Sequence, residues 1–296
     1  MTRRLLLDTS SLMYRAFFAL PASIVDGEGQ PVNALHGYLD MCARLIRERK
    51  PDQCIHCYDD DWRPAPRVAA YDGYKSTRSP DPEGLPEQFA TLREILDAVG
   101  MTQAEAPGWE AEDAIGTLCA RSRARDRMDI VTGDRDLIQL VRDPSVRVLF
   151  TRRGVSELDV FDEEAVLSKY GVPASRYADF AILRGDPSDA LPGVSGVGEK
   201  TARELVNTYS SLEALVSDAE ADRRTGKPLR RSPSLRARIR EAAEYVATMR
   251  QVVPIRTDLE VRLWTEEGDA DRLEALSTGH RLTGPVRRLR EALSSN

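Results

Sequence analysis

The sequence contains few cysteines and no long hydrophobic run. Its four cysteines, Cys42, Cys54, Cys57 and Cys119, form no disulfide framework in a chain of 296 residues, which fits a reducing compartment. No stretch approaches the roughly 20 consecutive apolar residues of a membrane-spanning helix, and the three leucines of MTRRLLLDTSS are too few for the core of a signal peptide. We therefore expect a globular protein of the cytoplasm with no membrane partner.

Histidine is equally scarce, and its scarcity excludes several kinds of enzyme. The three histidines, His36, His56 and His280, lie outside the acidic clusters described below, which argues against zinc hydrolase chemistry. The C-x-x-C pair of Cys54 and Cys57 has no second pair and lies inside an apparent strand, so we assign it to core packing. The sequence also lacks a G-x-S-x-G nucleophile elbow.

Positive charge is in deficit overall but not everywhere. The net charge of −6 would argue against a nucleic-acid partner if the charge were evenly placed. Residues 221–250, however, hold nine Lys and Arg against three Asp and Glu. Such a segment favours binding to a phosphate backbone. The alternative is a solvated basic helix and loop, and the sequence alone leaves both open.

Short apolar runs that lead into an acid alternate with helical patterns in the first half of the chain. RRLLLD, QCIHCYD and MDIVTGD predict strands. Helical spacing is found in TSSLMYRAFFAL, HGYLDMCARLIRER, PEQFATLREILDAVG and AEDAIGTLCARSRARD. This alternation predicts an α/β fold with a mostly parallel central sheet flanked by helices, whose ligand site lies beyond the carboxyl ends of the strands.

Acidic residues are expected to converge at that edge of the sheet. They follow the strands, lie on one turn in GWEAEDAIG, or lie in LRGDPSDALPGVSGVGEKTA: Asp8, Asp60, Asp134, Asp136, Glu110, Glu112, Asp113, Asp186 and Asp189. Any one of them could cap a helix. Together, however, the carboxylates would repel one another unless cations lay among them. Oxygen ligands without histidine favour Mg²⁺ or Mn²⁺ over zinc.

The segment from Gly193 to Thr201 is rich in glycine and comes close to a P-loop. A P-loop needs Lys directly after its last glycine, but Glu199 separates Gly198 from Lys200. What remains is a short loop with exposed amides between two helices. Such a loop can bind one backbone phosphate of a duplex without reading base sequence.

Taken together, the motifs of the chain resemble the bacterial 5′ nuclease family, the flap endonucleases and 5′-to-3′ exonucleases that also form the N-terminal domain of DNA polymerase I. The motifs that carry the resemblance stand in family order and spacing: LLLDTSSLMYRAFFAL, YDDDWRPAPRVAAYDGYKSTR, GWEAEDAIG, VTGDRDLIQL and LRGDPSDALPGVSGVGEKTA. The resemblance covers nearly the whole chain, and no polymerase region follows. We therefore expect a free-standing member of the family.

The resemblance implies roles for particular residues. It implies that the acids named above bind two or more Mg²⁺ or Mn²⁺ ions, with Asp60 chosen among three neighbouring aspartates by its spacing to Arg67 and Lys75. Lys75 and Arg78 match basic residues that face the scissile phosphate from the base of a helical arch, around residues 70–100, and Arg67 is counted with them as catalytic. The glycine loop matches a helix-three-turn-helix that grips duplex DNA and often holds K⁺. Its residues are Gly193, Gly196, Gly198, Lys200 and Thr201.

The sequence departs from the family pattern in three places. Thr9 stands where the family usually has Gly, Glu112 stands where it usually has Asp, and WRPAP replaces a stretch that commonly carries lysine. The longer Glu112 side chain changes the spacing expected at the second metal position. The proline-rich, acidic segment SPDPEGLPEQ leads us to expect a short arch.

We expect a PIN-like nuclease core over residues 1–180, a helix-three-turn-helix DNA-binding region over 181–270 and a helical C-terminal tail over 271–296. The function that follows is structure-specific hydrolysis of DNA with a 5′ flap or a free 5′ end, in replication and repair. We expect a monomer in the bacterial cytoplasm, associated with the nucleoid and with replication or repair proteins. Two alternatives stay open: a PIN-like ribonuclease, and a non-catalytic protein that binds DNA junctions.

Overall fold

The chain folds around one seven-stranded sheet with the strand order β6-β5-β4-β1-β2-β3-β7. The computed structural model describes residues 2–123, 125–221, 229 and 232–295. The strands are β1 (Arg3–Asp8), β2 (Gln53–Tyr58), β3 (Thr102–Glu105), β4 (Arg127–Thr132), β5 (Val146–Thr151), β6 (Leu158–Phe161) and β7 (Arg262–Trp264). The inner strands are parallel to one another, whereas the edge strands β6 and β7 pair antiparallel with β5 and β3.

The inner strands are apolar on both faces, which explains their position in the sheet. In β1, the buried side chains of Leu5 and Leu7 face one side and the buried Leu6 faces the other. Leu6 lies in register with Ile55 of β2 and Ile130 of β4. Burial on both faces is typical of parallel strands that are covered by helices on each side.

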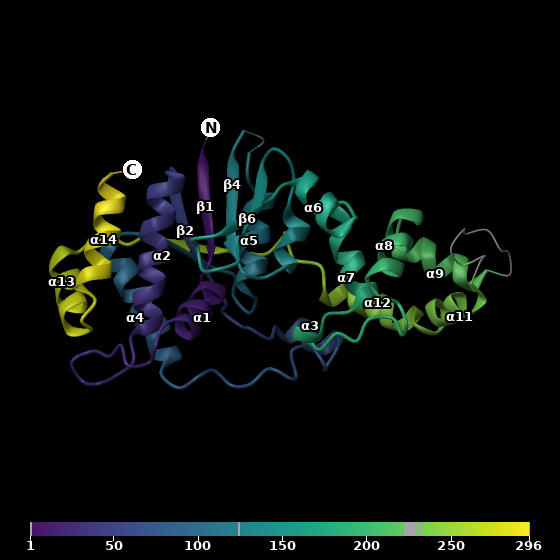
Figure 1. Cartoon of the computed structure of the whole chain (residues 1–296), viewed down its shortest axis with the longest axis horizontal. Coiled ribbons are helices and arrows are strands. Elements are labelled where there is room, and N and C mark those ends of the chain that lie inside the picture. Colours follow the sequence, from purple (N-terminus) through teal and green to yellow (C-terminus); the bar gives the residue numbers. More distant parts are fainter. Residues whose placement is uncertain (1, 124, 222–228, 230–231, 296) are drawn as a thin grey trace.

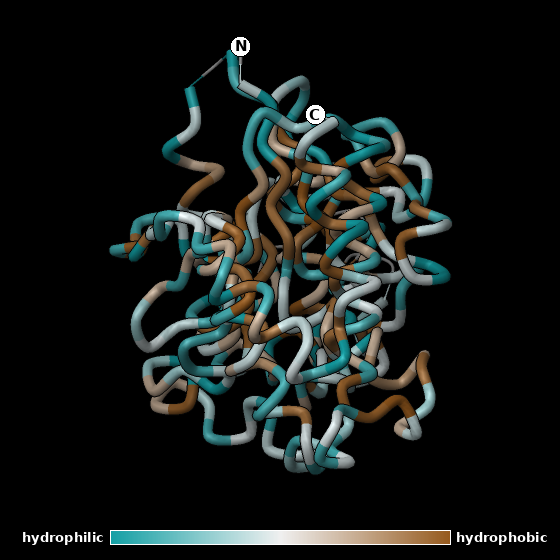
Figure 2. The backbone as a smooth tube through the Cα atoms, turned by 90° about the vertical axis from the view of Figure 1, so that its left-hand side faces the viewer, coloured by the Kyte–Doolittle hydropathy of each residue, from teal (hydrophilic) through white to brown (hydrophobic). Residues whose placement is uncertain are grey.

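Helices cover both faces of the sheet (Figure 1), and hydrophobic residues concentrate between the layers (Figure 2). The Leu5 face packs against α1 (Thr9–Ala19), α2 (Asn33–Arg49), α4 (Leu85–Val99), α13 (Ala270–Gly279) and α14 (Thr283–Ser294). The Leu6 face packs against α5 (Ala111–Ala120) and the 3-10 helix η1 (Asp136–Leu140), and its core continues into α7 (Tyr177–Arg184), α8 (Glu199–Thr208) and α12 (Ala243–Val252). The shorter or more peripheral helices are α3 (Ala65–Ala70), α6 (Glu163–Tyr170), η2 (Ala174–Arg176), η3 (Pro187–Asp189), α9 (Leu212–Glu220) and α11 (Pro233–Glu241).

The carboxyl ends of the parallel strands lie at one edge of the sheet, where α1 follows β1 directly. Residues 71–84, here called the crossing segment, contain no regular helix or strand and run along this edge from α3 to α4 (Figure 1). The expected arch around residues 70–100 therefore divides into two parts. Only the crossing segment lies over the strand ends, because α4 is a core helix with Leu92, Ile95 and Leu96 fully buried.

The helical second part lies at one end of the molecule and contains α7, α8, α9, α11 and α12 (Figure 1). After α12 the chain returns to the first part, where β7 pairs with β3 and α14 packs on α2. The expected tail over residues 271–296 is helical, and its buried Leu282, Val286 and Leu289 join the core. The domain boundary expected between residues 180 and 181 falls inside α7, and the domain limits stay a prediction.

The α/β fold class expected from the sequence is confirmed, with a mostly parallel sheet, flanking helices and a helical second part. Cys54 and Cys57 lie in β2, and burial raises the pKa of Cys54 to about 12, so this thiol stays protonated at neutral pH. Over the described residues, no helix combines the length and the apolar character needed to cross a membrane.

Candidate active site

A large cleft of about 1760 Å³ opens at the carboxyl ends of the parallel strands. Most of the acids expected from the sequence line it: Asp8, Asp60, Glu110, Glu112, Asp134 and Asp186. Lys75 and Arg78 of the crossing segment line it as well. Asp113, Asp136 and Asp189 lie behind this wall, in contact with the residues that form it. The fold therefore brings together acids that are up to 181 residues apart in sequence.

Asp8 connects the central strand to the cleft. It is the last residue of β1 and the N-cap of α1, where its Oδ1 accepts the Ser11 amide at 3.1 Å. Its Oδ2 accepts the Thr132 hydroxyl at 2.6 Å. The pKa of Asp8 is raised to about 7, first by burial and then by the neighbouring charges of Asp59 and Asp134, while the two hydrogen bonds act in the opposite direction. A carboxylate in this position favours a cation beside it.

Asp59 is an acid of the cleft that was not selected from the sequence. It directly follows the last residue of β2, its Oδ1 accepts the Ala111 amide at 2.7 Å, and its charge raises the pKa of Asp8. The selected Asp60 also lines the cleft but is exposed, and its Oδ2 accepts the Gly108 amide at 2.6 Å. The signal that could have identified Asp59 is its position, since the first residue after a parallel strand lies at the sheet edge.

The GDRD turn supplies two acids that lie next to each other. Asp134 accepts the Asp136 amide at 2.9 Å, and its own amide donates to the Thr132 hydroxyl at 2.8 Å. Loss of solvent contact raises the pKa of Asp136 well above its usual range, and the charges of Asp134 and Glu112 raise it further. The pKa of Asp134 is also raised, first by burial. We call Asp8, Asp59, Asp134 and Asp136 the strand-end acids.

Three further acids surround a buried arginine. The Nη1 of Arg67 contacts Glu110 and donates to Glu112 at 2.9 Å, while its Nη2 donates to Asp113 at 2.8 Å. Arg67 is only 1 % exposed, so it contacts the acids and not the solvent of the cleft. We call Arg67, Glu110, Glu112 and Asp113 the Arg67 cluster.

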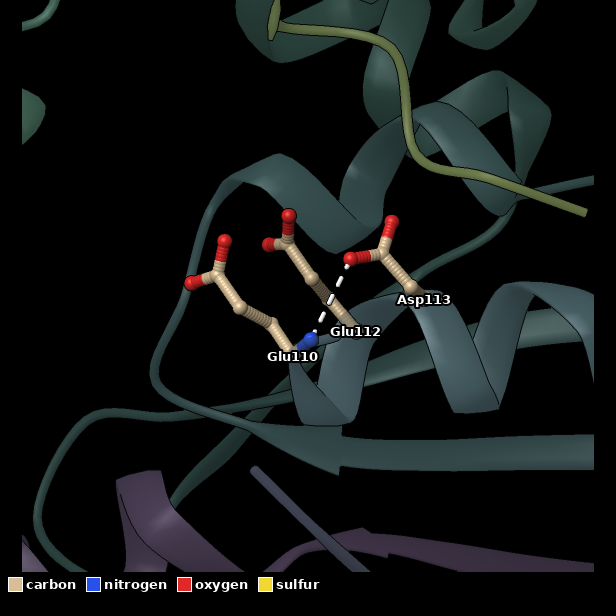
Figure 3. A group of neighbouring side chains, drawn as sticks. All are labelled: Glu110, Glu112 and Asp113. Carbon is tan, nitrogen blue, oxygen red and sulfur yellow. Dashed lines mark hydrogen bonds between the residues drawn. The ribbon is translucent and has the colours of Figure 1, made fainter. Parts of the chain in front are cut away.

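The acids of the Arg67 cluster lie at the start of α5 (Figure 3). Each offers a carboxylate oxygen, and these oxygens lie within 4.8 Å of one another. Asp113 is already held on two sides, because it accepts the Glu110 amide at 3.4 Å in a capping box and the Arg256 amide at 2.9 Å. Glu112, whose pKa burial raises despite the charge of Arg67, points to the cleft and is the most available of the three.

The crossing segment brings two cations to the acids. The Lys75 ammonium, which is 4 % exposed, contacts Glu110, and the Lys75 amide donates to the carbonyl of Asp189 at 3.0 Å. Arg78 donates from Nη2 to Asp189 Oδ1 at 2.7 Å. Both cations therefore lie where a bound phosphate would meet the acidic cleft.

Asp186 and Asp189 lie on the short turn of η3, directly before the glycine loop. Asp186 caps this turn, with its Oδ1 accepting the Ser188 amide at 2.9 Å. Its charge and that of Asp189 raise the pKa of Asp136, which places both near the strand-end acids. The loop thus begins at the cleft itself.

Two of the loop glycines are required by their surroundings. Gly193 has a φ of 70°, and a Cβ there would lie 2.6 Å from the backbone of Arg184. Gly196 has a φ of 68°, and a Cβ there would meet the guanidinium of Arg238 at 2.3 Å. Gly198 differs, because it is the N-cap of α8 and a Cβ there would meet nothing within 4 Å. The loop thus leaves Gly198 open, with Lys200 and Thr201 in the first turn of α8.

The basic segment 221–250 is described only in part. Residues 222–228, 230 and 231 lie outside the described residues, and five of the nine basic residues counted there fall among them. The described remainder forms α11 and α12, and Arg238 of α11 lies over Gly196 of the glycine loop. This part of the segment therefore adjoins the loop.

The donor set of the cleft fits a hard divalent cation. All of the candidate ligands are carboxylate oxygens, and the raised pKa values of Asp8, Asp134 and Asp136 indicate that charge is crowded and poorly solvated there. Oxygen-only ligand sets suit Mg²⁺ and Mn²⁺. His56, by contrast, is fully buried away from such a role, since burial lowers its pKa to about 3 and its Nδ1 lies 2.7 Å from the Tyr38 hydroxyl.

The chain matches two family models that together cover nearly its whole length. The 5′-3′ exonuclease N-terminal resolvase-like domain matches residues 3–171, and the 5′-3′ exonuclease C-terminal SAM fold matches residues 172–274. A 5′-3′ exonuclease of Streptomyces coelicolor is 42% identical over 98% of this chain and 100% of its own length. DNA polymerase I of Mycobacterium bovis is 43% identical over 82% of this chain, which corresponds to 27% of the polymerase.

The fold is also found among solved nucleases. The structure of the bacteriophage T5 D15 flap endonuclease, a pseudo-enzyme-product complex with DNA and metal ions, matches with a TM-score of 0.64, at 13% identity over 99% of this chain and 98% of that one. At this identity the likeness concerns the fold, which agrees with the sheet and the helical second part described above.

Proposed function

This chain belongs to the 5′-3′ exonuclease family, and from that premise we propose that it is a divalent-metal-dependent nuclease acting on DNA with a 5′ flap or a free 5′ end next to duplex. The observation that carries the proposal is the cleft itself, where acids from five separate segments meet Lys75 and Arg78. No single helix or loop needs such a concentration of charge for its own stability.

Mg²⁺ or Mn²⁺, when bound, would supply positive charge for the reacting phosphate and acidify a water molecule. The strand-end acids would hold these ions together with Glu112, Asp186 and Asp189. We include Asp59 because of its hydrogen bond to Ala111 and its effect on Asp8. Asp60 stays a prediction.

Lys75 and Arg78 would bind the scissile phosphate and stabilise the negative charge that develops on it. Each is fixed by an acid, Lys75 by Glu110 and Arg78 by Asp189, so their charges are held in position before substrate arrives. Arg67, counted with them from the sequence, acts differently in this proposal. Because it is 1 % exposed, it orients Glu110, Glu112 and Asp113 and does not contact DNA.

The glycine loop and α8 would bind the duplex backbone. Gly198 is open, the N-terminus of α8 follows it, and Arg238 lies over Gly196, two residues earlier in the same loop. Amides at a helix N-terminus and a nearby guanidinium are suited to phosphate and carry no base information. Occupation of this loop by K⁺ is part of the same proposal and predicts tighter duplex binding in K⁺ than in Na⁺ at equal ionic strength.

The proposal places the protein in DNA replication and repair, in line with its relationship to DNA polymerase I. A monomer in the bacterial cytoplasm, associated with the nucleoid, and recruitment by replication or repair proteins stay predictions. They are checked by light scattering and by imaging of the tagged protein on the nucleoid.

The direct test is cleavage of a 5′-labelled DNA flap in Mg²⁺, beside a matched single-stranded RNA and a reaction in EDTA. We expect cleavage of the flap alone, near the junction with the duplex, and none in EDTA. Preferential cleavage of the RNA would support the PIN-like ribonuclease instead. Tight flap binding without cleavage, and without heat on Mn²⁺ titration by calorimetry, would support the non-catalytic junction binder.

The duplex-binding role of the loop is tested with Gly198→Leu. A Cβ at Gly198 meets nothing within 4 Å, but a leucine side chain there would cover the amides. We therefore expect weaker binding to a duplex-bearing flap. The slope of log affinity against log salt concentration should decrease by about 1, which corresponds to one lost phosphate contact. The matched control is Gly279→Leu, at another glycine with open space around it. Mn²⁺ binding should be equal in all three proteins. Full DNA affinity in Gly198→Leu would exclude the loop as the duplex anchor.

A further inference from the structure

Trp62 differs from the other two tryptophans of the chain, because the described part of the structure offers its ring no partner. The Trp109 ring lies between two guanidinium groups, Arg67 at 5.8 Å and Arg256 at 5.1 Å from its centroid. Trp264 donates from Nε1 to Asp97 at 3.2 Å. Trp62 is 46% exposed, and among the described residues none forms a ring contact or side-chain hydrogen bond with it.

Trp62 lines the same cleft as the acids. It follows Asp59 by three residues, so its Cα lies within about 11 Å of that strand end. Among the large hydrophobic side chains that are exposed in the described residues, the aromatic ones are Phe18 and Trp62, and both line this cleft. Single exposed apolar side chains are common on protein surfaces, but exposed aromatic rings that gather on one cleft are typical of a ligand-binding surface.

The loop that carries Trp62 is fixed on both sides. On one side, the amides of Asp60 and Asp61 both donate to the carbonyl of Trp109 at 3.1 Å. On the other side, Arg63 donates from Nε to the carbonyl of Tyr74 at 2.7 Å and from Nη2 to that of Asp72. Trp62 therefore projects from a backbone that is held in place, and a ligand on its ring would order little else.

The charges around Trp62 indicate which part of a ligand it contacts. Asp60 and Asp61 precede it directly and would repel a phosphate, whereas Lys75 and Arg78 lie on the same cleft and attract one. An apolar ring together with nearby cations is suited to single-stranded nucleic acid, with a base on the ring and the backbone phosphates on the cations.

We propose that the indole of Trp62 stacks on an unpaired nucleobase of the cleaved strand, within a few nucleotides of the phosphate held by Lys75 and Arg78. The proposal rests on the nuclease function proposed above and adds the part of the substrate that this wall of the cleft recognises. Stacking uses the face that all bases share, so the site selects an unpaired base over a paired one and not one base over another.

The test compares Trp62→Leu, which keeps an apolar side chain but no aromatic ring, with Trp62→Phe, which keeps a ring. Binding is measured by anisotropy in Ca²⁺, on a flap series in which one nucleotide at a time near the junction is abasic. Loss of one base stack weakens binding about 5- to 150-fold. We expect this loss for Trp62→Leu on the intact flap, a much smaller loss for Trp62→Phe, and unchanged binding to a fully paired duplex.

The abasic series identifies the stacked base. At one abasic position, the parent should lose as much affinity as Trp62→Leu loses on the intact flap. Trp62→Leu should lose no further affinity on the flap with that abasic position. Leu167→Ala, at an exposed leucine outside the cleft, is the control and should bind like the parent. Binding of the intact flap should also quench tryptophan fluorescence in the parent and not in Trp62→Phe.

The proposal is overturned if Trp62→Leu binds the flap like the parent, if the two losses add at all positions, or if Trp62→Phe loses as much affinity as Trp62→Leu. Cleavage by the parent in Mg²⁺ on the same flap separates this outcome from a failure of the proposed function. If the parent cleaves the flap and the Trp62 variants bind it as well as the parent does, the stacking proposal is wrong and the nuclease function stands. If the parent does not cleave the flap, the proposed nuclease function is wrong. The binding series still decides whether Trp62 stacks on a base.

Discussion

The two groups of acids in the cleft differ in where their counter-charge comes from. In the Arg67 cluster, a buried guanidinium contacts all three carboxylates, and Lys75 contacts Glu110 as well. The strand-end acids accept hydrogen bonds from neutral donors, such as the Thr132 hydroxyl and the amides of Ser11 and Ala111. Within the described residues, none of these strand-end acids forms an ion pair.

This difference separates two roles that a list of acidic residues would merge. The acids of the Arg67 cluster have a counter-charge inside the protein, and without it they would be buried charges with no partner. Glu112, which also lines the cleft, is the member proposed to reach a bound ion as well. The strand-end acids repel one another, since the charge of Asp134 adds to burial in raising the pKa of Asp136, and in the proposed function a cation from solution would compensate them. Substitutions in the two groups should therefore have opposite effects on stability in the absence of metal.

The largest effect is expected for Asp134→Asn. This change removes a strand-end acid while preserving its size, so cleavage of the flap in Mg²⁺ should fall by about 10³-fold or more because a charge that holds the metal is lost. In EDTA the variant should unfold at the same or a higher urea concentration than the parent, since one repelling charge is gone. Rates come from single-turnover cleavage. The control is Asp129→Asn, which lies within β4 outside the cleft lining and pairs with Arg147. Retained cleavage would remove Asp134 from the site.

The contrasting change is Arg67→Met, which removes the counter-charge of the other group. A buried ion pair that loses one partner typically costs about 3–5 kcal/mol. We expect a loss of this size in the free energy of unfolding, measured with urea in EDTA. Arg44→Met breaks an exposed pair with Glu48 and should cost under about 0.5 kcal/mol. A loss below about 1 kcal/mol for Arg67→Met would contradict the division into two groups.

Arg78 stands between the groups, because it is 39% exposed and contacts Asp189 from the crossing segment. Arg78→Ala and Lys75→Ala should each lower the cleavage rate by about 10²-fold, since one preorganised charge at the reacting phosphate is lost. Binding of the flap should change less than the rate. Arg78→Lys, which keeps the charge, should recover part of the rate. Equal losses in binding and rate would make these residues general phosphate contacts.

The most gradual effect concerns pH and the metal-free protein, because it is spread over about three pH units. The pKa of Asp8 is raised from 3.8 to about 7 on folding, so between these values the unfolded chain has released a proton that the folded protein keeps. The stabilisation that Asp8 contributes is therefore complete below about pH 4 and decreases as the pH rises to 7, by at most about 1.4 kcal/mol per pH unit. Above pH 7 it no longer changes. Asp8→Asn should remove this contribution, so stability measured by urea unfolding in EDTA should decline less steeply with pH than in the parent.

The comparison with Asp8→Asn is necessary because His56 changes stability in the opposite direction. Burial lowers the pKa of His56 from 6.5 to about 3, so its contribution is complete above about pH 6.5 and is lost as the pH falls. Both proteins contain His56, and the difference between them isolates Asp8. A difference that stays constant from pH 4 to 7 would show that Asp8 titrates normally.

Much of the fold and of the cleft could be predicted from the sequence, because both are encoded locally. The apolar run RRLLLD and the helical spacing after it define β1 and α1 without long-range information. The edge strand β7 could not be predicted, since three residues carry no period and its pairing with β3 joins residues about 160 positions apart. The packing of α14 on α2 depends equally on contacts between the two ends of the chain.

The site was predicted less completely for a similar reason. Three consecutive aspartates follow β2, and which of them lies next to Asp8 depends on the residue at which the strand ends. Sequence patterns fix such a boundary only to within a few residues. Spacing to Arg67 selected Asp60, whereas Asp59 carries the electrostatic contact with Asp8. The contacts of Arg67 with three carboxylates also depend on tertiary packing, so the motif could indicate its importance but not its burial.

The return of the chain after α12 has a mechanical consequence. The Ile255 amide donates to Gln139 Oε1 at 3.0 Å and the Arg256 amide to Asp113 at 2.9 Å, so the helical second part is attached to the core where it leaves and again where it comes back. A module on one linker can swivel about it, but one held at two separated points cannot. Force on DNA bound at the glycine loop would therefore reach the start of α5 along two backbone paths. The distance between the glycine loop and the cleft would stay constant under that force.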